Sequence, residues 1–180
     1  MDIEHSTADG RLQNMSRFIS EAPAGLIIEV GVWKGGSLRY LAQTHPERTF
    51  FGFDTFEGMP QEGPLDNAHK KGDFGNTSFK DVQQALSDLP NVTLVKGYFP
   101  DSDVTGNQPI AMVHCDVDLY ESTLKTFRHL AGRMVPGARM YCDDAFQHTC
   151  EGATLALCQF AAETNRVPQF DLGSHPAFCF

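Results

Sequence analysis

Short apolar runs alternate with amphipathic stretches along most of this chain. The apolar runs occupy residues 26–30, 49–53, 92–95, 110–115 and 138–142. Their length and their content of β-branched and aromatic residues are typical of strands. Because each run is almost continuously apolar, we expect strands that are buried on both faces, as in a parallel sheet.

The stretches between these runs have the spacing of helices. Leu12, Met15, Phe18 and Ile19 recur at helical intervals, which predicts a short N-terminal helix over residues 10–22. Similar spacing predicts helices over 38–42, 79–89, 124–131 and 154–162. At the end of the chain, residues 167–172, the turn Gly173-Ser174 and residues 176–180 predict an antiparallel hairpin. Strands that alternate with helices predict a doubly wound α/β fold with a mainly parallel sheet.

The organisation of the chain indicates one domain over residues 1–180. The sequence has no internal repeat, low-complexity tract or shift in composition, and 180 residues suit a single core. Residues 55–77 are rich in glycine, proline and aspartate, which predicts a long loop. Long loops of this kind are often lids, so we expect it to close over a ligand.

Composition and charge narrow the classes of partner. The formal net charge of −9 disfavours nucleic acid and anionic membrane surfaces, because phosphates would be repelled. The chain has no 18-residue apolar run, and its polar, acidic first residues do not resemble a signal or transit peptide. Five cysteines without a CxxC pair predict reduced thiols and a cytoplasmic setting.

Carboxylates follow four of the predicted strands. In open parallel sheets the ligand site lies at the carboxyl ends of the strands, so these side chains are expected to gather there. Capping of the following helices is the alternative reason for an acid at any one of these positions. The residues concerned are Glu29, Asp54, Asp116, Asp118, Asp143 and Asp144.

The turn after the first strand suits a cationic ligand. Gly31 and Gly35 allow close approach of the backbone to a ligand, but the turn is neither GxGxxG nor a GK[ST] phosphate loop. Glu29 would repel a pyrophosphate and pair with a cation, and S-adenosylmethionine carries an ammonium and a sulfonium. Asp54, about twenty residues further on, can accept hydrogen bonds from both ribose hydroxyls.

The later acids predict a divalent cation. Two carboxylates about 4 Å apart repel by roughly 4 kcal/mol at an effective dielectric near 20, so a cluster of three or four protonates or collects a cation. Hard oxygen ligands suit Mg²⁺ or a similar ion. Such an ion lowers the pKa of a substrate hydroxyl, which can then attack a methyl group.

Two residues are candidates for the general base, and a third residue is a candidate for lining the site. Asp118 has the chemistry, although it can instead cap the helix that starts near residue 120. His69 in the long loop titrates near neutral pH, and His148 follows the Asp143-Asp144 pair closely enough to line the site. His114, inside a strand, is expected to be a core residue with its hydrogen bonds satisfied.

Four motifs together resemble a known family. They are Glu29-Val30-Gly31-Val32-Trp33-Lys34-Gly35-Gly36-Ser37, Gly52-Phe53-Asp54-Thr55-Phe56-Glu57-Gly58-Met59-Pro60, Asp116-Val117-Asp118-Leu119-Tyr120-Glu121-Ser122-Thr123 and Asp143-Asp144. This set resembles the macrocin and mycinamicin O-methyltransferases, which methylate sugar hydroxyls of antibiotics. The resemblance runs from about residue 25 to 160, and its DxDLYxST stretch is the most specific part.

The resemblance implies a class I methyltransferase fold with a seven-stranded sheet. It implies metal ligation by Asp116, Asp143 and Asp144, with Asp118 as general base and His69 as the second catalytic candidate. The acceptor would be a small molecule with a hydroxyl, a sugar or another vicinal diol, and a homodimer stays open. The expected contacts to S-adenosylmethionine are Glu29, Gly31, Gly35, Ser37, Asp54, Thr55, Asp73, Phe74 and Asp116.

Three other functions compete with this interpretation. A Mg²⁺-dependent phosphohydrolase would use Asp116 as nucleophile and Asp118 as acid, but three strand-helix units precede this DxD. A nicotinamide-dependent reductase would require a different glycine turn. A domain that binds the methyl donor without catalysis is the third alternative.

Overall fold

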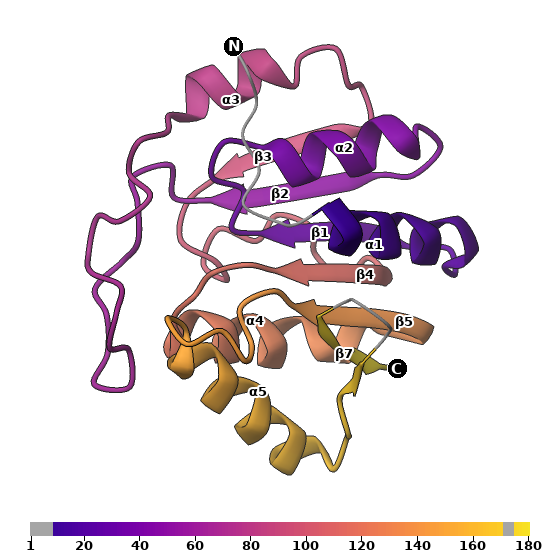
Figure 1. The fold of residues 1–180 in the computed structure, drawn as a ribbon. Helices are drawn as coiled ribbons and strands as arrows, with labels where there is room; N and C mark the ends of the chain where they lie inside the picture. The colour runs from indigo at the N-terminus through magenta and orange to yellow at the C-terminus, as the bar shows by residue number, and fades with distance from the viewer. Residues whose placement is uncertain (1–8, 171–174) are drawn as a thin grey trace.

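The computed structural model describes residues 9–170 and 175–180. These residues form a seven-stranded sheet in the order β3-β2-β1-β4-β5-β7-β6, which Figure 1 shows from β3 at the top to β7 at the bottom. The first five strands are parallel, and β7 runs antiparallel to both β5 and β6. The strands are β1 (Leu26–Val30), β2 (Phe50–Asp54), β3 (Val92–Lys96), β4 (Ile110–Cys115), β5 (Met134–Cys142), β6 (Gln169–Phe170) and β7 (Pro176–Cys179).

Helices cover both faces of this sheet, as the doubly wound prediction requires. They are α1 (Asp9–Glu21), α2 (Gly36–Thr44), α3 (Phe79–Ala85), α4 (Tyr120–Leu130) and α5 (Glu151–Thr164), with a 3-10 turn, η1, at Ala131–Arg133. Ile27 packs in a core with α1, α2 and α3, whereas Ile28 packs in a second core with α4 and α5. Successive strand residues point to opposite faces, so the continuous apolar run of β1 serves both cores. Across residues 9–170 and 175–180, no helix has the length and apolar character that crossing a bilayer requires.

Most element boundaries agree with the sequence, and the differences have local causes. The predicted helix over 79–89 ends at Ala85, although Leu86 remains buried beyond it. β5 begins at Met134 instead of 138, because the strand continues through Pro136 and Gly137 with an irregular register against β4. The pairing of β6 with β7 confirms the terminal hairpin, whereas its turn at Gly173-Ser174 lies outside the described residues.

The predicted loop over 55–77 contains no helix or strand, but it is ordered by its own hydrogen bonds. The Met59 amide donates to the Asp73 carbonyl at 2.8 Å, and the Gly72 amide donates to the Met59 carbonyl at 3.0 Å. The two arms of the loop therefore run side by side, and they extend away from the sheet in Figure 1.

The tip of this loop is attached to the N-terminal ends of two helices. Asp66 Oδ1 accepts a 2.9 Å hydrogen bond from the Tyr120 amide at the start of α4. Asn67 Nδ2 donates to Glu151 Oε2 at 2.7 Å at the start of α5. The loop thus spans from β2 to α4 and α5 across the carboxyl end of the sheet.

Candidate functional site

The carboxyl ends of four strands meet at one cleft. Its wall includes Gly31 after β1, Asp54 at the end of β2, Asp116 after β4 and Asp144 after β5. β1 and β4 are neighbours in the sheet but not in the sequence, so the cleft opens where the strand order reverses. Gly31 of the predicted turn and five of the six predicted acids therefore border the same cavity, whereas Glu29 does not.

Gly31 brings the ends of β1 and β4 together. Its φ is +96°, and a Cβ there would lie 1.7 Å from the Asp116 carbonyl oxygen. Only glycine fits this conformation and this distance. The sequence predicts a glycine here for the approach of a ligand. The structure gives a second reason for the glycine, because the backbone after β4 also lies against Gly31.

Asp54 is fixed at the mouth of the cleft by two backbone amides. Its Oδ2 accepts from the Trp33 amide and its Oδ1 from the Phe56 amide, both at 2.7 Å. An ionised carboxylate has about four acceptor positions, so two remain for a ligand. This geometry suits the predicted role of Asp54 toward a pair of ribose hydroxyls.

Two aromatic rings, those of Trp33 and Phe74, form an apolar wall on the side of the cleft where Asp54 lies. The centroids of Trp33 and Phe74 lie 5.7 Å apart with the rings at 81°. Trp33 Nε1 donates to Asn76 Oδ1 at 2.9 Å, and its carbonyl accepts from Thr77 Oγ1 at 2.7 Å. The loop therefore holds Trp33 in place, and both rings line the cleft.

Behind the cleft, two buried carboxylates share one histidine. His114, which has no exposed surface, places Nδ1 3.2 Å from Glu29 Oε2 and Nε2 3.1 Å from Asp143 Oδ1. Ionised carboxylates only accept, so both ring nitrogens donate and the ring is an imidazolium. Burial alone would lower the pKa of His114, but hydrogen bonds and charges from Asp143 and Glu29 raise it well above its ordinary value. The expectation of a satisfied core histidine is confirmed.

Asp143 has two further partners. Arg11 Nη1 lies 3.1 Å from Asp143 Oδ2 and 3.1 Å from His175 Nδ1, and His175 Nε2 lies 2.6 Å from Asp143 Oδ1. Because a guanidinium only donates, Nδ1 of His175 accepts and its proton lies on Nε2. Burial would raise the pKa of Asp143, but His114 and His175 hold it below its ordinary value. We refer to Arg11, Glu29, His114, Asp143 and His175 as the inner cluster.

Asp116 and Asp144, which we call the acid pair, have a different environment. Burial and the charge of Asp143 raise the pKa of Asp116 well above its ordinary value. Burial and the charges of Asp118 and Asp116 do the same for Asp144. Asp144 Oδ2 accepts one hydrogen bond, 2.8 Å from the Asp118 amide. The acid pair is therefore poorly compensated in the protein alone.

Asp118 and His69, the two catalytic candidates, lie together in the cleft. His69 Nε2 is 3.5 Å from Asp118 Oδ1, and each side chain is 18% exposed. Asp118 has a positive φ of 59°, so its backbone turns sharply after β4. Burial raises the pKa of Asp118 although His69 is close by. His148, the third candidate, is exposed on the segment before α5.

The predicted contacts to the methyl donor fall into two groups. Those that line the cleft are Gly31, Asp54, Thr55, Phe74 and Asp116. The other four are engaged elsewhere: Ser37 Oγ donates to Glu29 Oε1 at 2.8 Å, Gly35 precedes α2 with a φ of 81°, and Asp73 Oδ2 accepts from the Lys70 amide. A donor contact by these four stays a prediction.

Three residues at the site were not anticipated from the sequence. Arg11 comes from α1, His175 from the segment before β7, and Cys150 from the start of α5. Each reaches the site through tertiary packing, and none stands in a motif that signals chemistry.

Comparisons with known proteins agree with this geometry. A model of the macrocin O-methyltransferase (TylF) family matches residues 7–168. A 4'-O-methyltransferase from Streptomyces olivaceus that acts on 8-demethyl-8-(2,3-dimethoxy-alpha-L-rhamnosyl)-tetracenomycin C is 27% identical over 154 residues, 75% of this chain. Demethyldecarbamoylnovobiocin O-methyltransferase from Streptomyces niveus is 26% identical over 155 residues, 74% of this chain. The matched part spans 58% and 59% of the lengths of these two relatives.

Solved structures show the same architecture. The O-methyltransferase NovP superposes with a TM-score of 0.77 at 25% identity, over 94% of this chain and 78% of NovP. The calicheamicin methyltransferase CalS11 gives a TM-score of 0.78 at 23% identity, over 93% of this chain and 76% of CalS11. With its sheet order, its cleft at the strand ends and a family match over residues 7–168, the chain belongs to the macrocin O-methyltransferase family.

Proposed function

We propose that this chain transfers a methyl group from S-adenosylmethionine to a sugar hydroxyl in the cleft at the strand ends. The observation that carries the proposal is that Asp54 and the acid pair line one cavity. Methyl transfer needs the donor and the hydroxyl held in line at short distance, and a shared cavity provides that arrangement. Residues 9–170 and 175–180 then act as one catalytic domain, with the loop over 55–77 as its cover.

The donor occupies the side of the cleft that β1 and β2 form. The free acceptor positions of Asp54 bind the ribose hydroxyls, and the ring of Phe74 packs against the adenine. Gly31 leaves room beside the end of β1 for the methionine part. Glu29 acts indirectly, because its charge is already paired with His114.

The chemistry of the acid pair fits a hard divalent cation. Asp144 is buried and Asp116 is half-buried, both carboxylates have raised pKa values, and a cation would compensate both. Asp143 uses three acceptor positions on Arg11, His114 and His175, which leaves one for the ion. His114 lies within 4.8 Å of Asp116 and Asp143 but offers no lone pair, because it is protonated. A bound Mg²⁺ would supply Lewis acidity that lowers the pKa of the acceptor hydroxyl.

Asp118 accepts the proton of that hydroxyl in this proposal. It lines the cleft beside the acid pair, and its raised pKa makes it a stronger base than an ordinary aspartate. His69 acts as a positioning residue, because its Nε2 faces Asp118 Oδ1 and its Nδ1 lies 3.8 Å from Asp73 Oδ2.

The acceptor class follows from the relatives. The Streptomyces olivaceus enzyme methylates a rhamnosyl group by its name, and the match covers 75% of this chain. We therefore propose a free sugar hydroxyl of a glycoside as the acceptor, and a vicinal diol is not required, because this relative's substrate already carries methoxy groups at positions 2 and 3. A phosphohydrolase that uses Asp116 and Asp118 loses its support, because the family match is to O-methyltransferases.

Calorimetric titration with S-adenosylmethionine tests the donor site. We expect Asp54→Asn to weaken donor binding about 10- to 100-fold, as loss of charged hydrogen bonds of about 1.5–3 kcal/mol implies. Asp144→Asn should keep donor binding and lose the heat of Mg²⁺ binding. Asp101→Asn, an exposed aspartate, is the matched control. Absence of donor binding in the native protein would refute the proposal.

Transfer of a labelled methyl group to a rhamnosyl glycoside tests the proposed catalytic step. We expect turnover that depends on Mg²⁺ and falls at least 100-fold in Asp118→Asn, because general-base catalysis contributes about 10²–10⁴ in rate. Donor binding without turnover on any glycoside with a free sugar hydroxyl would instead identify a non-catalytic, donor-binding domain.

A further inference from the structure

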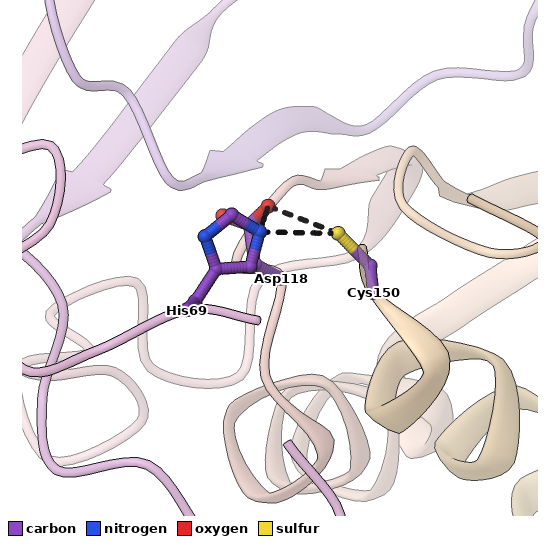
Figure 2. Close-up of side chains that lie close together, drawn as sticks. All are labelled: His69, Asp118 and Cys150. Carbon is purple, nitrogen blue, oxygen red and sulfur yellow. Dashed lines mark hydrogen bonds and ion pairs between the residues drawn. The ribbon is translucent and has the colours of Figure 1, made fainter. Parts of the chain in front are cut away.

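Three different metal-binding side chains converge at the edge of the cleft. Cys150 Sγ lies 3.3 Å from Asp118 Oδ1 and 3.5 Å from His69 Nε2, and the nitrogen and oxygen are 3.5 Å apart. Figure 2 shows the three atoms facing one another. A thiol, an imidazole and a carboxylate are the ligand types that proteins use for zinc.

The triangle of donor atoms has the size of a tetrahedral site. Bonds of about 2.3 Å to sulfur and about 2.0–2.1 Å to nitrogen and oxygen, at tetrahedral angles, place the donors about 3.3–3.6 Å apart. The three observed distances, 3.3, 3.5 and 3.5 Å, lie in that range. An ion could enter with little movement of the side chains.

Each ligand comes from a different element and is held by other contacts. His69 belongs to the loop, and its ring packs 5.7 Å from Phe74 while Nδ1 faces Asp73 Oδ2 at 3.8 Å. A carboxylate on the far nitrogen is the usual arrangement that orients a metal-binding histidine. Asp118 is anchored by its amide on Asp144, and the buried Cys150 by its amide on the Gln147 carbonyl.

We propose that His69, Asp118 and Cys150 form a binding site for a thiophilic divalent cation such as Zn²⁺, distinct from the hard site at the acid pair. All three residues line the cleft, so the fourth coordination position faces the cavity. Binding exchanges the thiol proton of Cys150 for the cation: the S–H bond breaks, a bond from sulfur to the metal forms, and the proton passes to solvent.

Occupation of this site has two consequences, which rest on the function proposed above. The cation takes Asp118 Oδ1, so Asp118 no longer accepts a proton and methyl transfer stops. It also joins the loop at residue 69 to the start of α5 at residue 150 and so fixes the cover of the cleft. The site is therefore inhibitory.

The test uses Co²⁺ as a spectroscopic substitute on the intact chain, with Mg²⁺ in excess to fill the acid pair. Only a thiolate ligand gives the intense near-ultraviolet charge-transfer absorption of cobalt. We expect this band to saturate at one equivalent in the native protein and in Cys158→Ser, whose exposed thiol makes it the matched control. Cys150→Ser should lose the band, and His69→Ala should weaken Co²⁺ binding at least tenfold.

Two results would overturn the proposal: no charge-transfer band in the native protein, or a band that persists in Cys150→Ser. The first would identify the three side chains as a hydrogen-bonded group only. If Cys150→Ser fails to fold, His69→Ala decides, because it changes an 18% exposed loop residue. Unchanged Co²⁺ affinity in that variant would then refute the site.

A rate measurement separates this proposal from the proposed function. We expect Zn²⁺ to inhibit methyl transfer by the native protein. For Cys150→Ser, with each rate normalised to the zinc-free rate of that variant, we expect the Zn²⁺ concentration that halves the rate to be at least tenfold higher than for the native protein. If the protein shows no methyl transfer, the cobalt band still reports the site. If transfer occurs and Zn²⁺ does not inhibit it, the inhibitory role is refuted.

Discussion

The inner cluster and the acid pair lie side by side at the end of the same sheet, yet only the carboxylates of the inner cluster are paired with cationic side chains. In the inner cluster, Glu29 and Asp143 share the imidazolium of His114, and Arg11 adds a second cation. In the acid pair, burial and neighbouring acids raise both pKa values well above the ordinary value. One group of carboxylates is compensated by the protein, and the other is left to a ligand.

The difference distinguishes scaffold from site. When one partner of a fully paired buried charge is removed by mutation, the protein is destabilised, because the remaining charges are left buried and unpaired. A buried acid without a cation lowers the stability of the protein until a ligand compensates it, and such groups gather at functional sites. Substitutions in the two groups should therefore change stability in opposite directions.

The largest effect is expected at His114. His114→Ala leaves Glu29 and Asp143 buried without their shared cation, so the free energy of unfolding should fall by about 3–5 kcal/mol. Urea unfolding followed by circular dichroism measures the change. His148→Ala, at an exposed histidine, should stay within about 0.5 kcal/mol. A loss below about 1 kcal/mol for His114→Ala would show that the inner cluster is not a scaffold.

The opposite sign is expected at Asp144. Asp144→Asn removes a poorly compensated acid and keeps an oxygen for the Asp118 amide, so the free energy of unfolding of the metal-free protein should rise. The native protein should gain about 2.7 kcal/mol from Mg²⁺ at 100 times its Kd, and the variant should gain little. Thermal unfolding with chelator and with Mg²⁺ measures both. A destabilised Asp144→Asn would remove the contrast between the two groups.

The same two groups show what the sequence could predict. The acid pair was predictable, because the carboxyl ends of parallel strands meet at one edge and the acids stand directly after apolar runs. The partnership of Glu29 with His114 was not, because it depends on the register that sets these residues opposite each other in β1 and β4. That register is not encoded in either strand alone, since the residues before Glu29 in β1 and before His114 in β4 are all apolar.

Longer-range partners were less accessible still. Arg11 and His175 lie 164 residues apart and meet only because α1 and the segment before β7 both reach the end of the sheet. Cys150 approaches Asp118 because α5 packs on α4. No local pattern distinguishes this cysteine from the buried thiols of Cys115 and Cys142.

A smaller contrast should appear in the dependence of stability on pH. The acid pair has raised pKa values, so its contribution in the metal-free protein increases as pH falls from 7 toward 4. The contribution of His114, whose pKa is raised well above 6.5, is complete below pH 6.5 and is lost progressively as pH rises above that value. The contribution of Asp143, whose pKa is lowered, is complete above about pH 3.8 and is lost only below it. The contributions of His114 and Asp143 are therefore flat between pH 6.5 and 4, whereas that of His175, whose pKa is lowered by burial, decreases as pH falls below 6.5.

The difference between native protein and Asp144→Asn isolates this effect. With chelator present, we expect the stability advantage of Asp144→Asn to shrink between pH 7 and 5, as protonation neutralises the native acid. With saturating Mg²⁺ the trend should reverse in the native protein, because protons compete with the cation. An advantage that does not change with pH in chelator would mean that the acid pair titrates normally.

The smallest effect concerns the covers of the two groups. Helix α1 covers the inner cluster and contributes Arg11 to it, whereas the loop over 55–77 brings His69 to the acid-pair side and is attached by Asp66. The residue before α4, Leu119, gives the helix no side-chain cap, and Asp66 supplies that acceptor from the loop. Asp66→Ala should therefore cost about 1 kcal/mol, and Asp66→Asn should restore most of it.

The location of the response matters more than its size. In Asp66→Ala we expect faster proteolysis and faster amide exchange in the loop, while amides of β1 and β4 beside the inner cluster keep their protection. S-adenosylmethionine with Mg²⁺ should slow loop cleavage in the native protein more than in the variant, because the ligands need a cover that still reaches α4. Equal cleavage of the native loop with and without these ligands would mean that it does not close over them.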